Sequence, residues 1–289
     1  MRGGCEGERV VFVYTQERVL ATRSLIDRRL KQLVPIREGP HSLIFRAALY
    51  SLLLPGKRLR PFLTLSVLEE YEIPVYRGVD PSCALEMVHT YSLIHDDLPC
   101  MDNDDIRRGK PSLHKAFGEG TALLAGNFLL TRAFEIVADH PRLLTILTSR
   151  CGADGLIGGQ LVDLLYEGRK VDWGTLQFIY LNKTAALFST ALEFGGVIAE
   201  VSEGDRIALK MAGQYFGVAF QLRDDLSDSI SEGSGKCSDL INKKATCLSL
   251  FSRERAEELI TFFLGRALSS LPRKMSSLRE LFFHHLKAD

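Results

Sequence analysis

Five aspartates lie in the stretch His95-Asp96-Asp97-Leu98-Pro99-Cys100-Met101-Asp102-Asn103-Asp104-Asp105, where a long apolar helical pattern ends. A second cluster follows much later in the chain, Phe220-Gln221-Leu222-Arg223-Asp224-Asp225-Leu226-Ser227-Asp228. Carboxylates packed this densely repel one another unless cations lie between them. The two clusters therefore predict two walls of one divalent-metal site, and the arginines beside them indicate a polyanionic ligand.

Helical periodicity surrounds both clusters. Between Leu20 and Leu33, apolar residues recur every three to five positions with charges between them. Gly and Pro breakers separate similar patterns, and no stretch alternates convincingly as a strand. The sequence therefore predicts a mobile leader over residues 1–16 and a single all-α domain of roughly ten or more helices over residues 17–289. The other helical patterns cover residues 41–54, 60–70, 81–98, 121–138, 142–166, 173–200, 203–228 and 252–286.

Composition limits the class of protein. The chain has 289 residues, of which 46% are hydrophobic and 25% charged, as is typical of a globular protein with an ample core. Lys+Arg and Asp+Glu are both 36, so no overall basic field favours nucleic acid. Apolar runs such as Ala47 to Leu54 fall short of the ~20 residues that a transmembrane helix needs. Six cysteines without CxxC spacing predict reduced thiols in a cytoplasmic protein.

The second cluster has the simpler geometry. Asp224 and Asp228 are four residues apart, so both lie on one helix face, and Gln221 joins that face three residues earlier. Two stacked carboxylates suit a hard cation such as Mg²⁺, which takes its remaining ligands from water and substrate phosphate.

The first cluster needs a break in its helix. Asp96 and Asp102 are six residues apart, about 240° around an ideal helix, and share a face only if the helix ends between them. Pro99 supplies that break. We therefore expect Asp96 and Asp97 at a helix C-terminus, with Asp102 curling back from the next turn. Carboxylates at this negative helix end are unfavourable without a cation, which favours the metal interpretation.

Each cluster also has a simpler interpretation. A lone Asp-Asp-x-x-Asp run is usually a solvated helix face. A calcium loop beginning at Asp102 is excluded, because Ile106 and Arg107 stand where an oxygen ligand and a glycine are required. Two clusters that each follow a strongly apolar helix argue against surface decoration.

Basic residues accompany the aspartates. Gly56-Lys57-Arg58-Leu59-Arg60-Pro61 places three cations within four residues, Arg107-Arg108 follows the first cluster, and Lys183-Thr184 lies in an apolar helix. Lysine or arginine facing a phosphate in a dry pocket forms charge-assisted hydrogen bonds. Any one of these groups is more often surface than site, but together they fit a cleft that holds two diphosphates.

These motifs resemble those of the trans-isoprenyl diphosphate synthases, the polyprenyl synthetases. The resemblance is strongest to the bacterial farnesyl and plant-type geranylgeranyl diphosphate synthases. It runs from about Leu43 to Thr246 and includes the first Asp-rich motif with its two-residue insertion. The other matching motifs are Gly-Lys-Arg-Leu-Arg-Pro at 56–61, Arg-Arg-Gly at 107–109, Gly158-Gly159-Gln160-x-x-Asp163, Lys183-Thr184 and Phe220-Gln221-x-x-Asp224-Asp225-x-x-Asp228.

The resemblance implies an isoprenoid synthase fold around a central cavity, usually as a homodimer. The implied reaction is the head-to-tail (1'-4) condensation of isopentenyl diphosphate with dimethylallyl or geranyl diphosphate, with three Mg²⁺ ions. The implied metal ligands are Asp96, Asp97, Asp102, Asp224, Asp225 and Asp228. The implied isopentenyl diphosphate site is Gly56, Lys57, Arg60, His89 and Arg108. The implied allylic diphosphate site is Arg107, Gln160, Asp163, Lys183, Thr184, Gln221, Lys236 and Lys244, of which Lys183, Thr184 and Gln221 also assist the chemistry.

Two positions depart from the family pattern. The glycine that often follows the lysine corresponding to Lys236 is absent, which makes Lys244 the closer match. Asn127 stands where relatives often have aspartate. The pair His284-His285 is interpreted as surface rather than as a metal site.

Product length is expected to depend on the helix before Asp96. Tyr91 and Ser92 lie roughly 6–7.5 Å before it along an ideal helix, where a bulky aromatic residue would stop a short hydrocarbon tail. The alternative is that Tyr91 is only a core residue. We expect a C15 product, farnesyl diphosphate, with C20 as the alternative.

Two other classes of function compete with the synthase. A non-catalytic regulatory subunit of this fold tends to lose one aspartate motif, and here both are intact. A class I terpene cyclase or an Mg²⁺-dependent phosphohydrolase would leave Lys57, Arg60, His89 and Arg108 without a second diphosphate to bind.

Overall fold

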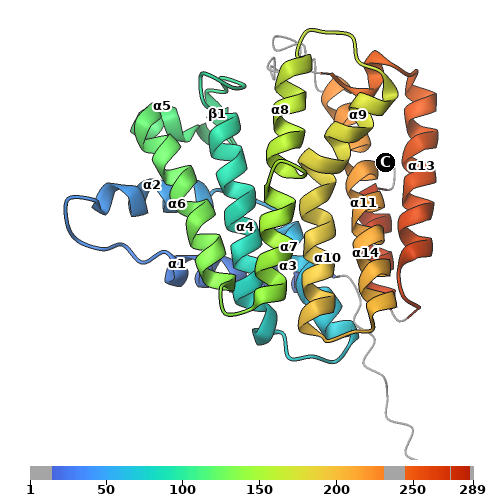
Figure 1. Cartoon of the computed structure of the whole chain (residues 1–289), viewed down its shortest axis with the longest axis horizontal. Coiled ribbons are helices and arrows are strands. Elements are labelled where there is room, and N and C mark those ends of the chain that lie inside the picture. The colour runs from blue at the N-terminus through green and yellow to red at the C-terminus, as the bar shows by residue number, and fades with distance from the viewer. Residues whose placement is uncertain (1–14, 231–244, 274, 287–289) are drawn as a thin grey trace, which may run out of the picture.

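The computed structural model of the chain describes residues 15–230, 245–273 and 275–286. The described chain is almost entirely helical, and its long helices run side by side (Figure 1), which confirms the all-α class. The α-helices are α1 (Gln16–Leu33), α2 (Ser42–Leu52), α3 (Leu59–Glu70), α4 (Tyr76–Asp96), α5 (Leu113–Phe117), α6 (Glu119–Val137), α7 (Pro141–Cys151), α8 (Leu156–Tyr166), α9 (Trp173–Ile179), α10 (Ala186–Ile198), α11 (Glu203–Ile230), α13 (Arg253–Ser270) and α14 (Ser276–Leu286).

Three helices form the centre of the protein. Helices α3, α4 and α10 bury nearly every residue over most of their lengths. α10 packs against both α3 and α4, and α4 also packs along α6. A helix that is apolar on more than one face is stable only when neighbours cover it all round. This burial fixes the position of the last turn of α4, which carries the first aspartate cluster.

Three of the expected helices are interrupted. The pattern over 142–166 divides into α7 and α8 at a Gly-rich turn. In this turn a β-carbon on Gly155 would lie 2.2 Å from the carbonyl oxygen of Arg150. The pattern over 252–286 divides into α13 and α14 around Pro272, and the pattern over 173–200 contains the π-helix η1 (Tyr180–Ala185). Periodicity continues through these breaks, because the helices on either side bury similar faces.

One feature was not predicted from the sequence, a short β-hairpin after the first cluster. Strand β1 (Ile106–Arg107) pairs antiparallel with β2 (Lys110–Pro111). The two turn residues have positive φ angles, 54° at Arg108 and 76° at Gly109. Tight two-residue hairpins favour this left-handed geometry. The hairpin therefore sends two neighbouring side chains to different places. Arg107 reaches Asp97, and Arg108 reaches Gly56.

The first cluster ends its helix as predicted. α4 stops at Asp96, and Asp97 is its C-terminal cap. The backbone N–H of Asp102 then donates to the carbonyl oxygen of Asp96 at 2.8 Å. The break at Pro99 thus brings Asp102 back beside Asp96.

The remaining predictions concern the N-terminal leader and the lack of a transmembrane helix. The expected leader falls almost wholly outside the described residues, and Thr15 caps the start of α1 by accepting from the Arg18 N–H. Among the described helices, none combines the length and apolar character needed to cross a membrane.

Candidate active site

Arg60, on the first turn of α3, lies in a cluster with His89 and Arg108, which we call the Arg60 pocket. Its guanidinium lies over the ring of Phe188, with Cζ 4.5 Å from the ring centroid. Its Nε is buried and has no hydrogen-bond partner in the described part of the chain. Burial lowers the pKa of Arg60 to about 10, with Arg108 lowering it further and Glu86 opposing both. A buried guanidinium with an unsatisfied donor is suited to bind an anion.

His89 and Arg108 complete this pocket. The pKa of His89 is held well below its usual value, first by burial and then by Arg60 and Arg108, so the imidazole is neutral at pH 7. Arg108 comes from the hairpin turn, and its Nη1 would lie 2.6 Å from a β-carbon on Gly56. The structure therefore brings together Gly56, Arg60, His89 and Arg108, four of the residues that the resemblance assigns to isopentenyl diphosphate.

Lys57, the remaining member of the predicted set, is exposed on the loop before α3. That loop also borders a cavity of about 440 Å³ between α1, α3 and α14. Lys57 is close enough to His285 on α14 to lower its pKa. The loop is therefore packed on one side and open to this cavity on the other.

Arg107 neutralises the middle of the first aspartate cluster. Its Nε donates to Asp97 Oδ1 at 2.9 Å and to Oδ2 at 3.2 Å, and its Nη2 donates to Asp97 and, at 3.1 Å, to Asp104. Burial raises the pKa of Asp97 and Arg107 opposes that rise. A cavity of about 10 Å³ beside this pair is also lined by Thr90 and Arg108. Asp97 is thus engaged by an arginine that the resemblance assigns to the substrate.

Lys183 lies in the π-helix and faces the first cluster. Its Nζ donates to Asp163 Oδ2 on α8 at 2.5 Å. Burial would lower the pKa of Lys183, but Asp96, Asp163 and Asp102 together raise it above its ordinary value. The ammonium is therefore charged and lies near both carboxylates at the end of α4. A π-helical turn often marks a functional site, because its extra residue displaces a side chain from the regular helix face.

Gly159 allows this approach. A β-carbon at Gly159 would lie 2.3 Å from the backbone nitrogen of Lys183, so only glycine lets α8 pack this closely against η1. Gln160 follows on the same helix and is partly buried. The Gly158-Gly159-Gln160-x-x-Asp163 motif therefore supplies both the close contact and the carboxylate that pairs with Lys183.

A chain of hydrogen bonds continues from Lys183's neighbour to α11. The hydroxyl of Thr184 donates to Gln221 Oε1 at 2.7 Å, and Gln221 Nε2 donates to Asp225 Oδ1 at 2.9 Å. The other oxygen of Asp225 accepts from the Tyr180 hydroxyl and, at 2.8 Å, from the Cys247 N–H. Burial raises the pKa of Asp225, and these donors act against that rise. Both of its oxygens are therefore engaged within the protein.

The second cluster divides into a buried and an exposed part. Asp224, adjacent to Asp225, is exposed and acts electrostatically on Arg60, which links this wall to the cationic pocket. The side chain of Asp228 and all of Lys236 and Lys244 lie outside what the structure describes, so their assignments stay predictions.

The described residues contain no group of three His, Cys, Asp or Glu side chains that is already arranged to hold a metal ion. The donors nevertheless suit Mg²⁺. Asp96 and Asp102 meet at one turn, Asp224 belongs to the opposite cluster, and all three offer only hard carboxylate oxygens.

Sequence reasoning missed Tyr180 and Cys247, which hold Asp225, and the role of Arg58. Tyr180 and Cys247 stand outside any motif, so nothing in their spacing could have identified them. Arg58 was grouped with Lys57 and Arg60, but its side chain is buried and ion-paired to Asp27 and Glu86. Its partners lie on α1 and α4, which only the tertiary structure brings to it.

Two aspartate clusters and two groups of cationic side chains in an all-α bundle, taken with the family match that follows, identify a prenyltransferase. The polyprenyl synthetase model matches residues 41–282, and this chain belongs to the polyprenyl synthetase family. This result confirms the resemblance carried by the motifs.

Known relatives include both product classes. The chain is 40% identical to a farnesyl diphosphate synthase of Bacillus subtilis (strain 168), over 85% of this chain and 87% of the relative. It is 38% identical to a heterodimeric geranylgeranyl pyrophosphate synthase large subunit of Arabidopsis thaliana, over 83% of this chain and 69% of the relative. Its fold matches the crystal structure of an FPP/GFPP synthase from Zymomonas mobilis with a TM-score of 0.84, at 33% identity, covering 93% of this chain and 97% of that one.

Proposed function

We propose that this protein condenses isopentenyl diphosphate head to tail with an allylic diphosphate, dimethylallyl or geranyl diphosphate, and releases farnesyl diphosphate. One observation carries the proposal. In the described part of the chain, Arg60 Nε is a buried donor without a hydrogen-bond partner, and Arg60 groups with His89 and Arg108. Lys183, beside the first aspartate cluster, instead pairs with Asp163. Two anion sites of this kind fit two diphosphate substrates, whereas a cyclase or phosphohydrolase binds one.

The Arg60 pocket suits isopentenyl diphosphate. Two guanidinium groups supply permanent charge, and the neutral imidazole of His89 offers one donor without adding repulsion. Gly56 has no side chain, which lets the Arg108 guanidinium pack against its backbone. We assign Lys57, which is exposed on the same loop, to the outer phosphate.

The allylic diphosphate fits between the aspartate clusters. Lys183 and Arg107 supply cations, and Asp96, Asp102 and Asp224 would hold Mg²⁺, for which the resemblance implies three ions. When bound, Mg²⁺ neutralises the diphosphate and stabilises it as a leaving group. We assign Asp225 to holding Gln221, because both of its oxygens already accept hydrogen bonds within the protein.

Gln221 and Thr184 are placed to stabilise positive charge on the allylic carbon. Asp225 accepts from the amide nitrogen of Gln221, which leaves the amide oxygen directed to Thr184. Fixed oxygen dipoles lower the energy of a cation that forms beside them. The carbon–oxygen bond of the allylic diphosphate breaks, the double bond of isopentenyl diphosphate attacks the resulting cation, and the released diphosphate takes the proton.

Tyr91 supports a C15 product. It is buried on α4, and its ring packs edge-on against that of His95 at 4.9 Å between centroids. Cys151 at the end of α7 lies close enough to affect the pKa of Tyr91. A tail growing from Asp96 along α4 would meet this aromatic side chain within two turns. A geranylgeranyl product remains the second candidate, since relatives of both kinds are similar to this chain.

One assay tests the function. The protein is incubated with Mg²⁺, isopentenyl diphosphate and dimethylallyl diphosphate, and the products are separated by chain length. We expect farnesyl diphosphate. A C20 product would select the geranylgeranyl alternative, and no condensation with any allylic primer would support the regulatory subunit.

We further propose that the chain forms a homodimer. Helix α8 exposes Ile157, Leu161 and Leu165 at four-residue spacing, so these side chains form one apolar stripe. Such a stripe is costly in water and is suited to pack against another helix. Sedimentation of the wild type and of Leu161→Glu tests this, and an unchanged monomer mass in both would contradict it. The cytoplasmic location and the single domain over residues 17–289 stay predictions.

A further inference from the structure

Arg58 occupies an unusual position in the basic run before α3. It lies between Lys57 and Arg60, yet its residue is only 2% exposed. Its φ angle is +50°, in the left-handed region, which costs an L-residue roughly 1–2 kcal/mol. Such a conformation persists only when the surroundings hold it firmly.

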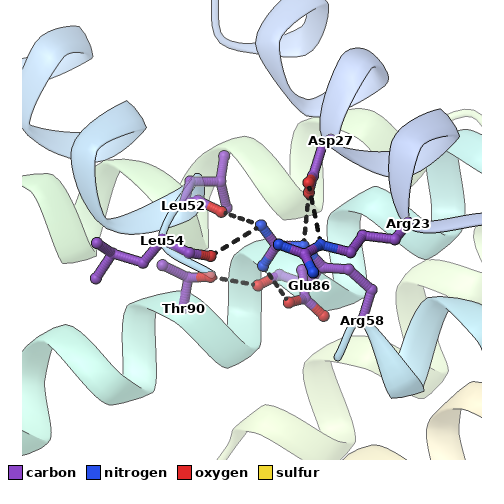
Figure 2. A network of polar contacts seen from close by, with 7 residues as sticks. All are labelled: Arg23, Asp27, Leu52, Leu54, Arg58, Glu86 and Thr90. Atoms are coloured by element: carbon purple, nitrogen blue, oxygen red, sulfur yellow. Dashed lines mark hydrogen bonds and ion pairs between the residues drawn. The ribbon is translucent and has the colours of Figure 1, made fainter. Parts of the chain in front are cut away.

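Four hydrogen bonds hold the guanidinium in place (Figure 2). Nε donates to Asp27 Oδ1 at 2.7 Å, and Nη1 donates to Glu86 Oε1 at 2.9 Å. Nη2 donates to the carbonyl oxygens of Leu52 at 2.8 Å and Leu54 at 3.3 Å. The planar fork of arginine can serve all four acceptors at once, whereas the single ammonium of lysine cannot.

These contacts join three parts of the protein. Asp27 belongs to α1, Glu86 to α4, and the two carbonyl groups to the end of α2 and the loop that follows it. Arg58 itself is the N-cap residue of α3. Its position therefore fixes the loop that carries Gly56 and Lys57, and it also fixes the first turn of α3.

Packing alone would not hold this loop. One side of it faces the cavity of about 440 Å³ between α1, α3 and α14. On the other side, Glu86 lies one turn before His89 on α4, so its ion pair with Arg58 ties the loop to the helix that carries the imidazole. Arg60 follows two residues after Arg58.

We infer that Arg58 is a positioning residue for the isopentenyl diphosphate pocket. It does not bind the substrate itself, but holds Gly56, Lys57 and Arg60 in register with His89 through Asp27 and Glu86. The inference rests on the proposed function for its kinetic consequence, because the pocket must bind isopentenyl diphosphate for that consequence to appear.

Arg58→Lys tests this inference, because it keeps the charge and removes the fork. In steady-state condensation assays we expect the KM for isopentenyl diphosphate to rise about tenfold, which corresponds to roughly 1.4 kcal/mol. The KM for the allylic diphosphate should stay within about twofold, because its site does not involve this loop. A general loss of fold would lower the apparent kcat and leave both KM values unchanged, because KM does not depend on the amount of active enzyme.

Arg23→Lys is the matched control. Arg23 also faces Asp27, with Nε 3.8 Å from Oδ2, but its side chain is 41% exposed and Figure 2 draws no hydrogen bond from it to the carbonyls of Leu52 and Leu54. We expect wild-type values for both constants. If Arg58→Lys leaves the KM for isopentenyl diphosphate within twofold of wild type, or raises both KM values equally, the inference is wrong.

A second measurement does not depend on activity. Hydrogen exchange of the amides in 53–59 should be faster in Arg58→Lys and, to a smaller extent, in Asp27→Asn, which removes one anchor and keeps the guanidinium. Unchanged exchange in both variants would overturn the inference. If the wild type forms no condensation product, the proposed function fails, while faster exchange would still show that Arg58 holds the loop.

Discussion

The guanidinium of Arg108 lies against the α-carbon of Gly56, so closely that a β-carbon there would be 2.6 Å from its Nη1. The two residues belong to separate segments, the loop before α3 and the hairpin after α4. Glycine is therefore required at this position for close approach rather than for its backbone angles. The contact joins the two segments that carry the residues we propose for isopentenyl diphosphate.

Gly56→Ala should weaken the binding of isopentenyl diphosphate. The added methyl group must displace the Arg108 side chain, which is flexible, so the fold should tolerate the change. We expect the KM for isopentenyl diphosphate to rise about tenfold or more, the effect of losing one charged hydrogen bond of roughly 1.5 kcal/mol. Gly265→Ala on α13 is the control, because nothing lies within 4 Å of its β-carbon position. An unchanged KM in Gly56→Ala would contradict the placement of Arg108.

Adjacent aspartates on α11 should behave differently when each is changed to asparagine. Asp225→Asn places an amide where both oxygens accept hydrogen bonds, so we expect a loss of about 1–3 kcal/mol of stability together with lower kcat. Asp224→Asn removes an exposed charge that we propose holds Mg²⁺. It should lower kcat on the order of 100-fold with an unchanged Tm. Thermal unfolding and kinetics of both variants check this, and equal Tm values would refute the assignment of Asp225.

Tyr91→Ala should lengthen the product. Removing the buried ring opens space beside His95 for a longer hydrocarbon tail, at a cost of about 3 kcal/mol in stability. Chromatography of the dephosphorylated products measures chain length directly. Tyr76→Ala is the control, since Tyr76 begins the same helix but is 76% exposed. If both variants give the wild-type product, Tyr91 is only a core residue.

His285 should make the fold less stable in acid. The pKa of His285 is lowered from 6.5 to about 4, first by burial and then by the nearby charges of Lys57, His284 and Arg223. Between these values the unfolded chain binds a proton that the folded chain does not, so stability falls as the pH falls through this window. The Tm of wild type should therefore drop more between pH 7 and pH 4.5 than that of His285→Gln. His140→Gln, at an exposed position, should behave as wild type. Parallel pH profiles for wild type and His285→Gln would show that His285 is not responsible.

Much of the architecture followed from local patterns. Apolar periodicity predicted the all-α class, and Pro99 predicted both the end of α4 and the return of Asp102 toward Asp96. These features depend on chain geometry within a few residues. The β-hairpin was missed because its strands have only two residues each, too short to show alternation.

Tertiary packing decided which members of each motif face the site. The run at 56–61 presents three cations in sequence, but Arg58 turns inward to Asp27 and Glu86 while Arg60 faces the pocket. In the second cluster, Asp225 accepts hydrogen bonds from Tyr180, Gln221 and Cys247, whereas Asp224 is exposed. Neighbouring residues on a helix point in different directions, and what each direction meets depends on distant segments.

The sequence by itself therefore determined the helices of this protein. It also determined which carboxylates and cations are available, because their motifs follow the order found in the family. It did so because periodicity and motif composition are local properties. Only the tertiary structure decided which charges neutralise one another inside the protein and which stay available to a ligand. Burial makes an unpaired charge costly, so the interior pairs the groups it encloses and leaves the others to the site.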